Sequence, residues 1–196
     1  LPYGGAKAGL TLKSFELTDN FAIREELIEK LADCLFELSA YVPAPDMGTN
    51  ENDIQIIYNN HTRKLSTDKH SRGGAGRPVE KGGIPIDDWE LTAHGLFSAI
   101  KALESRDETL DLSRTKFIIQ GFGNVGAPTA RKLQESGATL VGASDINIAL
   151  WNPNGLDVQA LDKIRGNPGG LNNYPFEVDR KFSSDKLDWL LEAPCD

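Results

Sequence analysis

The sequence is poor in cysteine, since Cys34 and Cys195 are the only two in 196 residues. They lie far apart without Cys-x-x-Cys spacing, which excludes a disulfide framework and a cysteine-based zinc site. No apolar run approaches the roughly 20 residues that a membrane helix needs. No signal peptide opens the chain, which starts with Leu1 rather than Met, so we expect its natural N-terminus to have been lost. These absences predict a reduced, cytoplasmic protein without membrane segments.

Positive charge is also in short supply. The chain has 21 Lys and Arg against 29 Asp and Glu, a formal net charge of −8. General nucleic-acid affinity needs clustered basic residues, so this balance argues against a nucleic-acid partner. Hydrophobic residues make up 39%, charged residues 26%, and mean hydropathy is −0.36, as is typical of soluble globular proteins. The length allows one large domain or two small ones.

In the first half, apolar residues at helical spacing predict a helix over 20–41, with Asn20 among its candidate caps. Asn50 and Asp53 indicate the start of a short second helix. Residues 60–85 are polar and rich in glycine, which predicts a long loop or a linker. We favour a solvated loop over a phosphate lid for its basic residues, which are Lys64, Lys69, Arg72, Arg77 and Lys81. No metal site is expected, because the histidines His61, His70 and His94 lack metal-ligand spacing.

The second half predicts a helix over 86–105, with Asp87 and Glu90 at capping-box spacing. Its expected apolar face consists of Trp89, Leu96, Phe97 and Ile100. The period then changes, and strands are predicted over 116–120 and 138–145, separated by a helix that Gly137 closes. A turn over 152–155, a short helix after it and a helix beginning near 183 complete the prediction. Trp89, Trp151 and Trp189 are expected in a core or an interface.

A Gly-x-Gly-x-x-Gly motif lies between the first predicted strand and its helix, formed by Gly121, Phe122, Gly123, Asn124, Val125 and Gly126. The motif alone is weak, but the leading strand, the following helix and an acid after the next strand supply the context it needs. Gly121 allows a sharp turn, Gly123 leaves a pyrophosphate unobstructed, and Gly126 allows close helix packing. The helix N-terminus offers N–H donors to phosphate. The alternative is an ordinary strand–turn–helix.

The acid after the second predicted strand is Asp145. A carboxylate here, roughly 20 residues after the turn, can accept hydrogen bonds from both ribose hydroxyls and repel a 2′-phosphate. This position favours NAD as cofactor, with NADP possible. The alternative is an acid that stabilises the loop or caps a helix.

Two further residues are candidates for catalysis. Lys7 is flanked by glycine and alanine, which leave space for a small ligand, and its ammonium could clamp a carboxylate or act near neutral pH if desolvated. Asp46 lies in the stiff segment Pro43–Thr49, which suits a group that transfers a proton from one direction. The alternatives are a solvated surface lysine and an aspartate that stabilises its turn.

Several segments together resemble the glutamate/leucine/phenylalanine/valine dehydrogenases. PYGGAKAG, PAPDMGT, GRPVEKGG and QGFGNVG occur in that family's order, NPNGLDVQAL is similar, and GFGNVG and PAPD most resemble the glutamate dehydrogenase branch. The resemblance implies an α/β fold, in which a Rossmann-type dinucleotide-binding domain follows part of an α/β substrate domain. It places the partial substrate domain at 1–84 and the incomplete NAD(P)-binding domain at 85–196. It also implies a cleft active site and a homo-oligomer, usually a hexamer.

The resemblance implies NAD(P)-dependent oxidative deamination of an amino acid, with L-glutamate the expected substrate, to a 2-oxo acid and ammonium. Lys7 matches the catalytic lysine that activates water and polarises the substrate, and Asp46 matches the aspartate that moves protons at the substrate nitrogen. A lysine of lowered pKa and a buried aspartate would suit these roles. Thr92 matches a threonine near the nicotinamide, and Gly121, Gly123 and Asn124 match the family's dinucleotide turn. Phe122 and Val125 of the same turn and Asp145 complete the candidate cofactor residues.

The sequence also departs from the family pattern. Ala8 replaces a usual glycine, and LTAHG over 91–95 replaces Ala-Thr-Gly, another residue and Gly. The family's upstream substrate lysines and its downstream serine and asparagine are absent, so we expect this chain to be a piece of a longer protein. The alternative is a catalytically silent nucleotide-binding or regulatory module, or an inactive fragment. A malic-type or hydroxy-acid dehydrogenase would not explain PYGGAK followed by PAPD.

Overall fold

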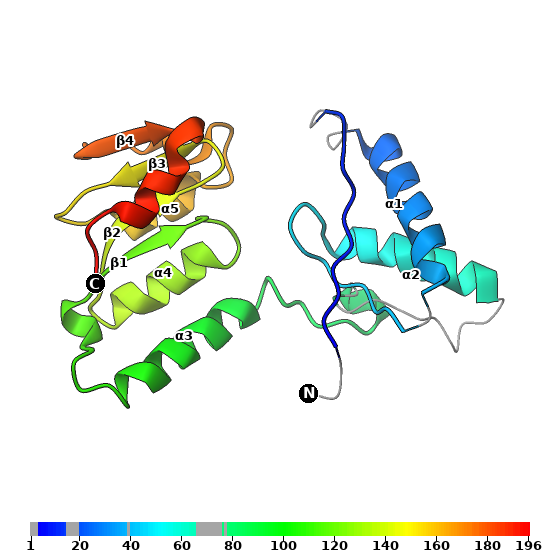
Figure 1. Ribbon diagram of the computed structural model, residues 1–196, viewed down its shortest axis with the longest axis horizontal. Coiled ribbons are helices and arrows are strands. Elements are labelled where there is room, and N and C mark those ends of the chain that lie inside the picture. The colour runs from blue at the N-terminus through cyan, green and yellow to red at the C-terminus, as the bar shows by residue number, and fades with distance from the viewer. Residues whose placement is uncertain (1–3, 15–19, 39, 66–75, 77) are drawn as a thin grey trace. The chain divides into compact units, whose positions relative to one another are not determined.

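The computed structural model describes residues 4–14, 20–38, 40–65, 76 and 78–196. The chain divides into two compact units, Leu1–Pro85 (unit 1) and Ile86–Asp196 (unit 2). The described part of unit 1 contains helices and no strand, while the sheet lies in unit 2 (Figure 1). Among the described residues, no helix combines the length and the apolar character required to cross a membrane.

Unit 1 is built around two helices, α1 (Phe21–Phe36) and α2 (Glu51–Leu65). Asn20 caps α1, as predicted, since its side chain accepts from the N–H groups of Ala22 and Ile23. The apolar contact between the helices consists of Ile28, Ala32, Leu35, Ile54 and Ile57. A short 3-10 helix, η2, covers Val79–Lys81.

The predicted loop over 60–85 is wrong for its first six residues, because α2 continues to Leu65. Two polar residues that suggested a loop are buried against α1. The Asn60 amide donates to Glu29 at 2.6 Å and to Asp33 at 2.9 Å, and His61 Nε2 lies 2.9 Å from the Ala32 carbonyl. Lys64 belongs to this helix, whereas Lys69, Arg72 and Arg77 lie outside the described residues, as does the Lys81 side chain.

Unit 2 contains a four-stranded sheet in the order β1-β2-β3-β4. The strands are β1 (Lys116–Gln120), β2 (Thr139–Ser144), β3 (Ile148–Trp151) and β4 (Arg180–Ser183). The two predicted strands are confirmed and pair in parallel, with α4 (Gly126–Glu135) as the crossover. β3 and β4 were not predicted, and both pair antiparallel, so the sheet is mixed.

Helices cover both faces of this sheet (Figure 1). One face packs on α4 and on α5 (Val158–Ile164), and the other packs on η5 (Ser184–Glu192), a 3-10 segment where the sequence predicted a helix. Side chains of β3 alternate between the two cores, with Ile148 and Leu150 on the α4 side and Ala149 and Trp151 on the η5 side. The remaining 3-10 segments are η3 (Leu112–Arg114) and η4 (Gly170–Asn173).

Helix α3 (Leu91–Glu104) is shorter than the predicted helix over 86–105. Residues 86–90 form turns instead, and the predicted capping box is wrong, because Glu90 is the N-cap and makes no side-chain capping bond. The predicted apolar face is correct for Phe97 and Ile100, which pack toward Leu112 and Leu133. It is wrong for Trp89 and Leu96, whose exposed fractions are 60% and 45%.

Candidate functional site

The glycine turn joins β1 to α4 and is fixed to the end of β2. The N–H groups of Gly121 and Phe122 donate to the Ser144 carbonyl at 3.0 and 2.7 Å. Gly121 has φ +91°, in the left-handed region that favours glycine. Phe122 is buried in the core beside α4, whereas Val125 is 36% exposed. The turn is therefore anchored below by its phenylalanine and lies open at the carboxyl end of the parallel strands.

The glycines of the turn differ in the space around them. A Cβ on Gly126 would lie 2.2 Å from the Gly121 carbonyl oxygen and 2.7 Å from Ile119 Cγ2, so only glycine lets α4 start this close to β1. A Cβ on Gly123 would meet no atom within 4 Å. The space beside Gly123 is thus open to a ligand, next to a helix end whose first N–H groups lack helical partners. These residues fit the pyrophosphate of a dinucleotide.

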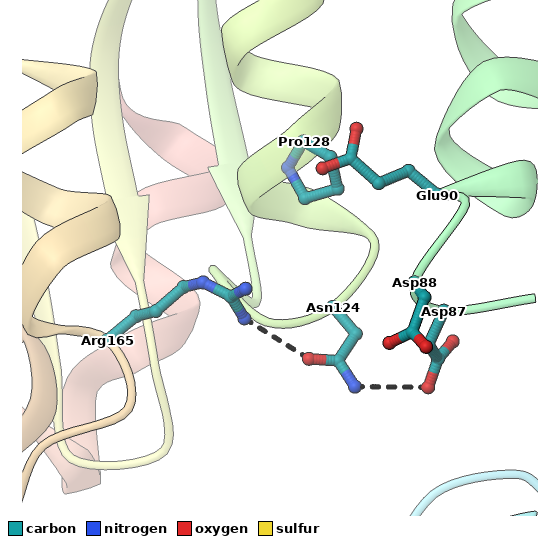
Figure 2. Close-up of a pocket in the computed structure, with 6 residues that line it drawn as sticks. All are labelled: Asp87, Asp88, Glu90, Asn124, Pro128 and Arg165. Atoms are coloured by element: carbon teal, nitrogen blue, oxygen red, sulfur yellow. Dashed lines mark hydrogen bonds between the residues drawn. The ribbon is translucent and has the colours of Figure 1, made fainter. Parts of the chain in front are cut away.

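Asn124 is held between charges of opposite sign (Figure 2). Its amide nitrogen donates to Asp87 Oδ2 at 3.2 Å, and its amide oxygen accepts from Arg165 Nη1 at 3.1 Å. A small pocket of about 180 Å³ surrounds them, lined by Asp87, Asp88, Glu90, Asn124, Pro128 and Arg165. Sequence reasoning missed Arg165, because no local motif marks a side chain that reaches the turn from the end of α5.

Thr92 is the second residue of α3 and is exposed. Glu90, the N-cap of α3, has φ +51°, and it is the one non-glycine residue with positive φ in the described part of the chain. It forms ion pairs with Arg131 and with Lys132, the latter at 3.3 Å, and so connects the start of α3 to α4. Burial opposes the charge on Glu90, but these cations outweigh it and hold the pKa of the carboxyl below its usual range.

Asp145 follows β2 directly and is half-buried. Its Oδ1 accepts from the N–H groups of Asn147 and Ile148 at 2.8 and 3.0 Å, and its Oδ2 accepts from the Leu171 N–H at 2.8 Å. This is the arrangement expected of an acid that stabilises its own turn. The ribose contact stays a prediction.

Lys7 and Asp46 form an ion pair in unit 1. Their side chains are 83% and 61% exposed. The hydrogen bond from Lys7 lowers the pKa of Asp46, and the same bond raises the pKa of Lys7. The raised pKa of Lys7 and the exposure of Asp46 differ from the lysine of lowered pKa and the buried aspartate that were expected. In unit 1 the pairing, and not burial, sets the direction of these shifts.

The turn that carries Asp46 is fixed by its own residues and by α1. Asp46 Oδ1 accepts from the Met47 N–H at 2.8 Å, and the Thr49 hydroxyl donates to the Asp46 carbonyl at 2.9 Å. Gly48 has φ +80°, and its carbonyl accepts from Arg24 Nη2 at 2.8 Å. Arg24 in turn pairs with the buried Asp53 of α2. The Asp46 carboxylate therefore projects from a turn tied to both helices of unit 1.

The structure thus gathers the candidates in two places. Lys7 and Asp46 meet in unit 1. Unit 2 holds the candidate cofactor residues, which are Thr92, Gly121, Phe122, Gly123, Asn124, Val125 and Asp145. Within the described ranges, no cluster of three or more His, Cys, Asp or Glu residues could hold a metal ion.

Comparison with known proteins agrees with these observations. The glutamate/leucine/phenylalanine/valine dehydrogenase family model matches residues 82–196. The mitochondrial glutamate dehydrogenase of Dictyostelium discoideum is 30% identical over 209 residues, and the NADP-specific glutamate dehydrogenase of Saccharolobus shibatae is 31% identical over 200 residues. Both alignments include all of this chain but only 40% and 45% of the relatives, so it spans less than half the length of these proteins.

Solved structures show the same fold. Plasmodium falciparum glutamate dehydrogenase 2 superposes with a TM-score of 0.64 and 26% identity, covering 89% of this chain and 39% of that one. The Leu-bound hetero-hexameric glutamate dehydrogenase of Thermus thermophilus gives a TM-score of 0.61 at 23% identity, covering 82% and 37%. The predicted α/β fold with a Rossmann-type domain is confirmed. The chain belongs to the glutamate/leucine/phenylalanine/valine dehydrogenase family, and the relatives named above are glutamate dehydrogenases.

Proposed function

We propose that the protein is an amino-acid dehydrogenase that converts L-glutamate, water and NAD(P)⁺ to the 2-oxo acid, ammonium, NAD(P)H and a proton. One observation carries the proposal. The same chain pairs Lys7 with Asp46, each in a segment that resembles the family's catalytic segments, and also builds an open glycine turn that fits a dinucleotide. The two relatives named above are glutamate dehydrogenases, and their names support glutamate as the substrate.

The proposal assigns cofactor binding to unit 2. When bound there, NAD(P)⁺ would supply the hydride acceptor for oxidation at the substrate Cα. Around it, Gly121 and Gly123 would leave space for the pyrophosphate, and the N-terminus of α4 would supply N–H donors to it. Asn124 would contact the cofactor from the turn, and Thr92 would do so from the first turn of α3. Either NAD or NADP is proposed, since one relative is named as NADP-specific.

The proposal assigns proton transfer and charge stabilisation to unit 1. Ionised Asp46 can accept a proton from the substrate ammonium, which prepares the amine for loss of hydride from Cα. When water adds to the iminium carbon, the attacking water loses a proton and the nitrogen gains one, which gives a neutral carbinolamine hydroxyl. Protonated Lys7 can donate a hydrogen bond to this oxygen. Because the pair raises the pKa of Lys7 and lowers that of Asp46, both groups carry the required charge at neutral pH.

Glutamate-dependent reduction of NAD⁺ and NADP⁺ tests the proposal on purified protein. Lys7→Ala and Asp46→Asn should each abolish turnover and leave NADH affinity within about threefold of wild type, because neither residue belongs to the turn. Lys13→Ala is the matched control, since Lys13 is an exposed lysine of the same unit and should not matter. Joint loss of turnover and NADH binding in Lys7→Ala would refute the assigned role.

One other result would favour the alternative function. If wild type binds NADH but shows no turnover with any amino acid, a silent nucleotide-binding module is supported and the dehydrogenase proposal fails. We also propose a homo-oligomeric assembly, which sedimentation of the purified protein can test. A cytoplasmic location stays a prediction, and one relative is named as mitochondrial.

A further inference from the structure

Asp145 makes more hydrogen bonds to its own chain than a ribose-binding acid needs. One carboxylate oxygen, Oδ1, accepts from the N–H groups of Asn147 and Ile148, which close the tight turn between β2 and β3. These two bonds are local, and an asparagine could make them as well. They explain why an acid or amide suits this turn, but they leave the second oxygen unexplained.

The second oxygen, Oδ2, holds a segment that is distant in sequence. It accepts from the Leu171 N–H at 2.8 Å, where Leu171 is fully buried in the core beneath α5. The backbone of Gly170 approaches the same oxygen so closely that a Cβ would lie 2.3 Å from it, and Gly170 has φ +50°. Only glycine at position 170 therefore leaves space for the Asp145 carboxylate. The contact fixes the start of η4 to the end of β2.

A count of acceptor sites limits what else this carboxylate can do. A carboxylate offers about four lone-pair sites, two on each oxygen. The two bonds on Oδ1 use both of its sites, and the Leu171 bond uses one of the two on Oδ2. One site remains, whereas gripping both ribose hydroxyls needs two. Asp145 could make that double contact only by releasing a backbone N–H.

We propose that Asp145 is a positioning residue that anchors the Gly170–Leu171 backbone to the end of β2, and that it does not select NAD over NADP by a double ribose contact. The part that concerns cofactors rests on the proposed function. The anchor itself is a property of unit 2 alone.

The anchored segment has a second attachment to the candidate cofactor site. Arg165, six residues before Leu171, donates to the Asn124 side chain in the glycine turn. Residues 165–171 are thus tied to Asn124 at one end and to Asp145 at the other. Loosening the Asp145 end should disturb the site equally for a cofactor with or without a 2′-phosphate. The affinities for NADH and NADPH should therefore fall by the same factor.

Asp145→Asn tests the anchor selectively. Its single oxygen can keep the local bonds to Asn147 and Ile148, but its amide nitrogen then faces the Leu171 N–H, and two donors cannot bond. Amide hydrogen exchange, measured without cofactor on the full chain, should quicken at Leu171 by at least about tenfold, since a charge-assisted bond is lost. Ile146→Ala is the control, because Ile146 is adjacent and 80% exposed, and it should leave Leu171 unchanged.

Gly170→Ala reaches the same contact from the backbone side. Its methyl group would displace Asp145 Oδ2, so Leu171 exchange should quicken as in Asp145→Asn. The double variant should exchange no faster than the faster single variant, because both changes break one contact. The anchor would be overturned if the rate increases of the two single variants multiplied in the double variant, or if Leu171 exchange were unchanged in Asp145→Asn.

Titration of wild type and Asp145→Asn with NADH and with NADPH tests the cofactor part. The ratio of the two dissociation constants should stay within about threefold of wild type, whereas a shift of about tenfold or more toward NADPH would show that Asp145 selects the cofactor. If wild type binds neither, the proposed function fails, and the exchange measurement still decides the anchor.

Discussion

Two Gly→Ala substitutions in the glycine turn, each of which adds one methyl group, distinguish an effect on cofactor binding from an effect on folding. At Gly126, a new Cβ would lie 2.2 Å from a backbone oxygen and 2.7 Å from Ile119 Cγ2, and neither helix nor strand can move without disturbing the core. At Gly123, a new Cβ would meet nothing within 4 Å, and its φ is not in the left-handed region. The same substitution therefore has opposite consequences three residues apart.

The magnitudes follow from these environments. Overpacking of this kind costs about 1–3 kcal/mol, so Gly126→Ala should lower the Tm of unit 2 by roughly 4–12 °C, at about 4 °C per kcal/mol for a unit of this size. Gly123→Ala adds no clash and reduces the freedom of the unfolded chain, so its Tm should stay within about 2 °C of wild type. Its methyl group occupies the space assigned to pyrophosphate, and NADH affinity should fall by about tenfold or more.

Calorimetry and NADH fluorescence titration on the same preparations check both halves. Gly123→Ala should be stable and bind weakly, whereas Gly126→Ala should be destabilised. Undiminished NADH binding by Gly123→Ala would refute the assignment of this space to the cofactor. A larger loss of stability in Gly123→Ala than in Gly126→Ala would refute the packing argument itself.

Two further predictions concern charge. Arg24→Met leaves the Asp53 carboxylate, which is 3% exposed, without its cation. The free energy of unfolding of unit 1, measured in urea, should therefore fall by about 3–5 kcal/mol, and adding Asp53→Asn should partly restore it. A decrease below about 1 kcal/mol would contradict this prediction. Glu90, paired with Arg131 and Lys132, has a lowered pKa, so its stabilisation is complete above the ordinary glutamate pKa of about 4.3 and is lost as pH falls through the folded-state pKa. Glu90→Gln should remove this part of the fall in Tm at acid pH. If the variant lost as much Tm at acid pH as wild type does, the result would argue against the ion pair.

The part of the fold that sequence predicts well is the part set by neighbouring residues. β1, the glycine turn and α4 form one continuous local signal, in which a β-branched run changes to helical spacing across glycines. Gly137 ends this helix with φ +95°, as its position predicted. Asn20 caps α1 for the same reason, because a cap needs only the next few N–H groups.

The features that sequence missed depend on distant partners. β4 is a short, polar strand that becomes a strand only by pairing with β3. The end of α2 looked like a loop because Asn60 and His61 are polar, and their partners lie on α1. Trp89 was predicted on the apolar face of a helix, in a core or an interface, yet it lies in the turn before α3 and is 60% exposed.

The candidate site divides in the same way. Gly121 and Gly126 could be assigned from sequence, because backbone geometry or close packing requires glycine at each of these positions. The Lys7–Asp46 pairing joins residues far apart in sequence, and only resemblance to a family suggested that both belong to one site. Arg165 and the Leu171 N–H carry no local signal, since their importance comes from reaching Asn124 and Asp145 across the fold.

The proposed dinucleotide site is the turn between β1 and α4. Backbone amide NMR spectra of the nitrogen-labelled chain, recorded during titration with NADH, test it most directly. Addition of NADH should produce saturable shifts concentrated at residues 121–127, with unit 1 amides near Lys7 and Asp46 much less affected. If saturating NADH left the amides of residues 121–127 unshifted, this turn would not be the cofactor site.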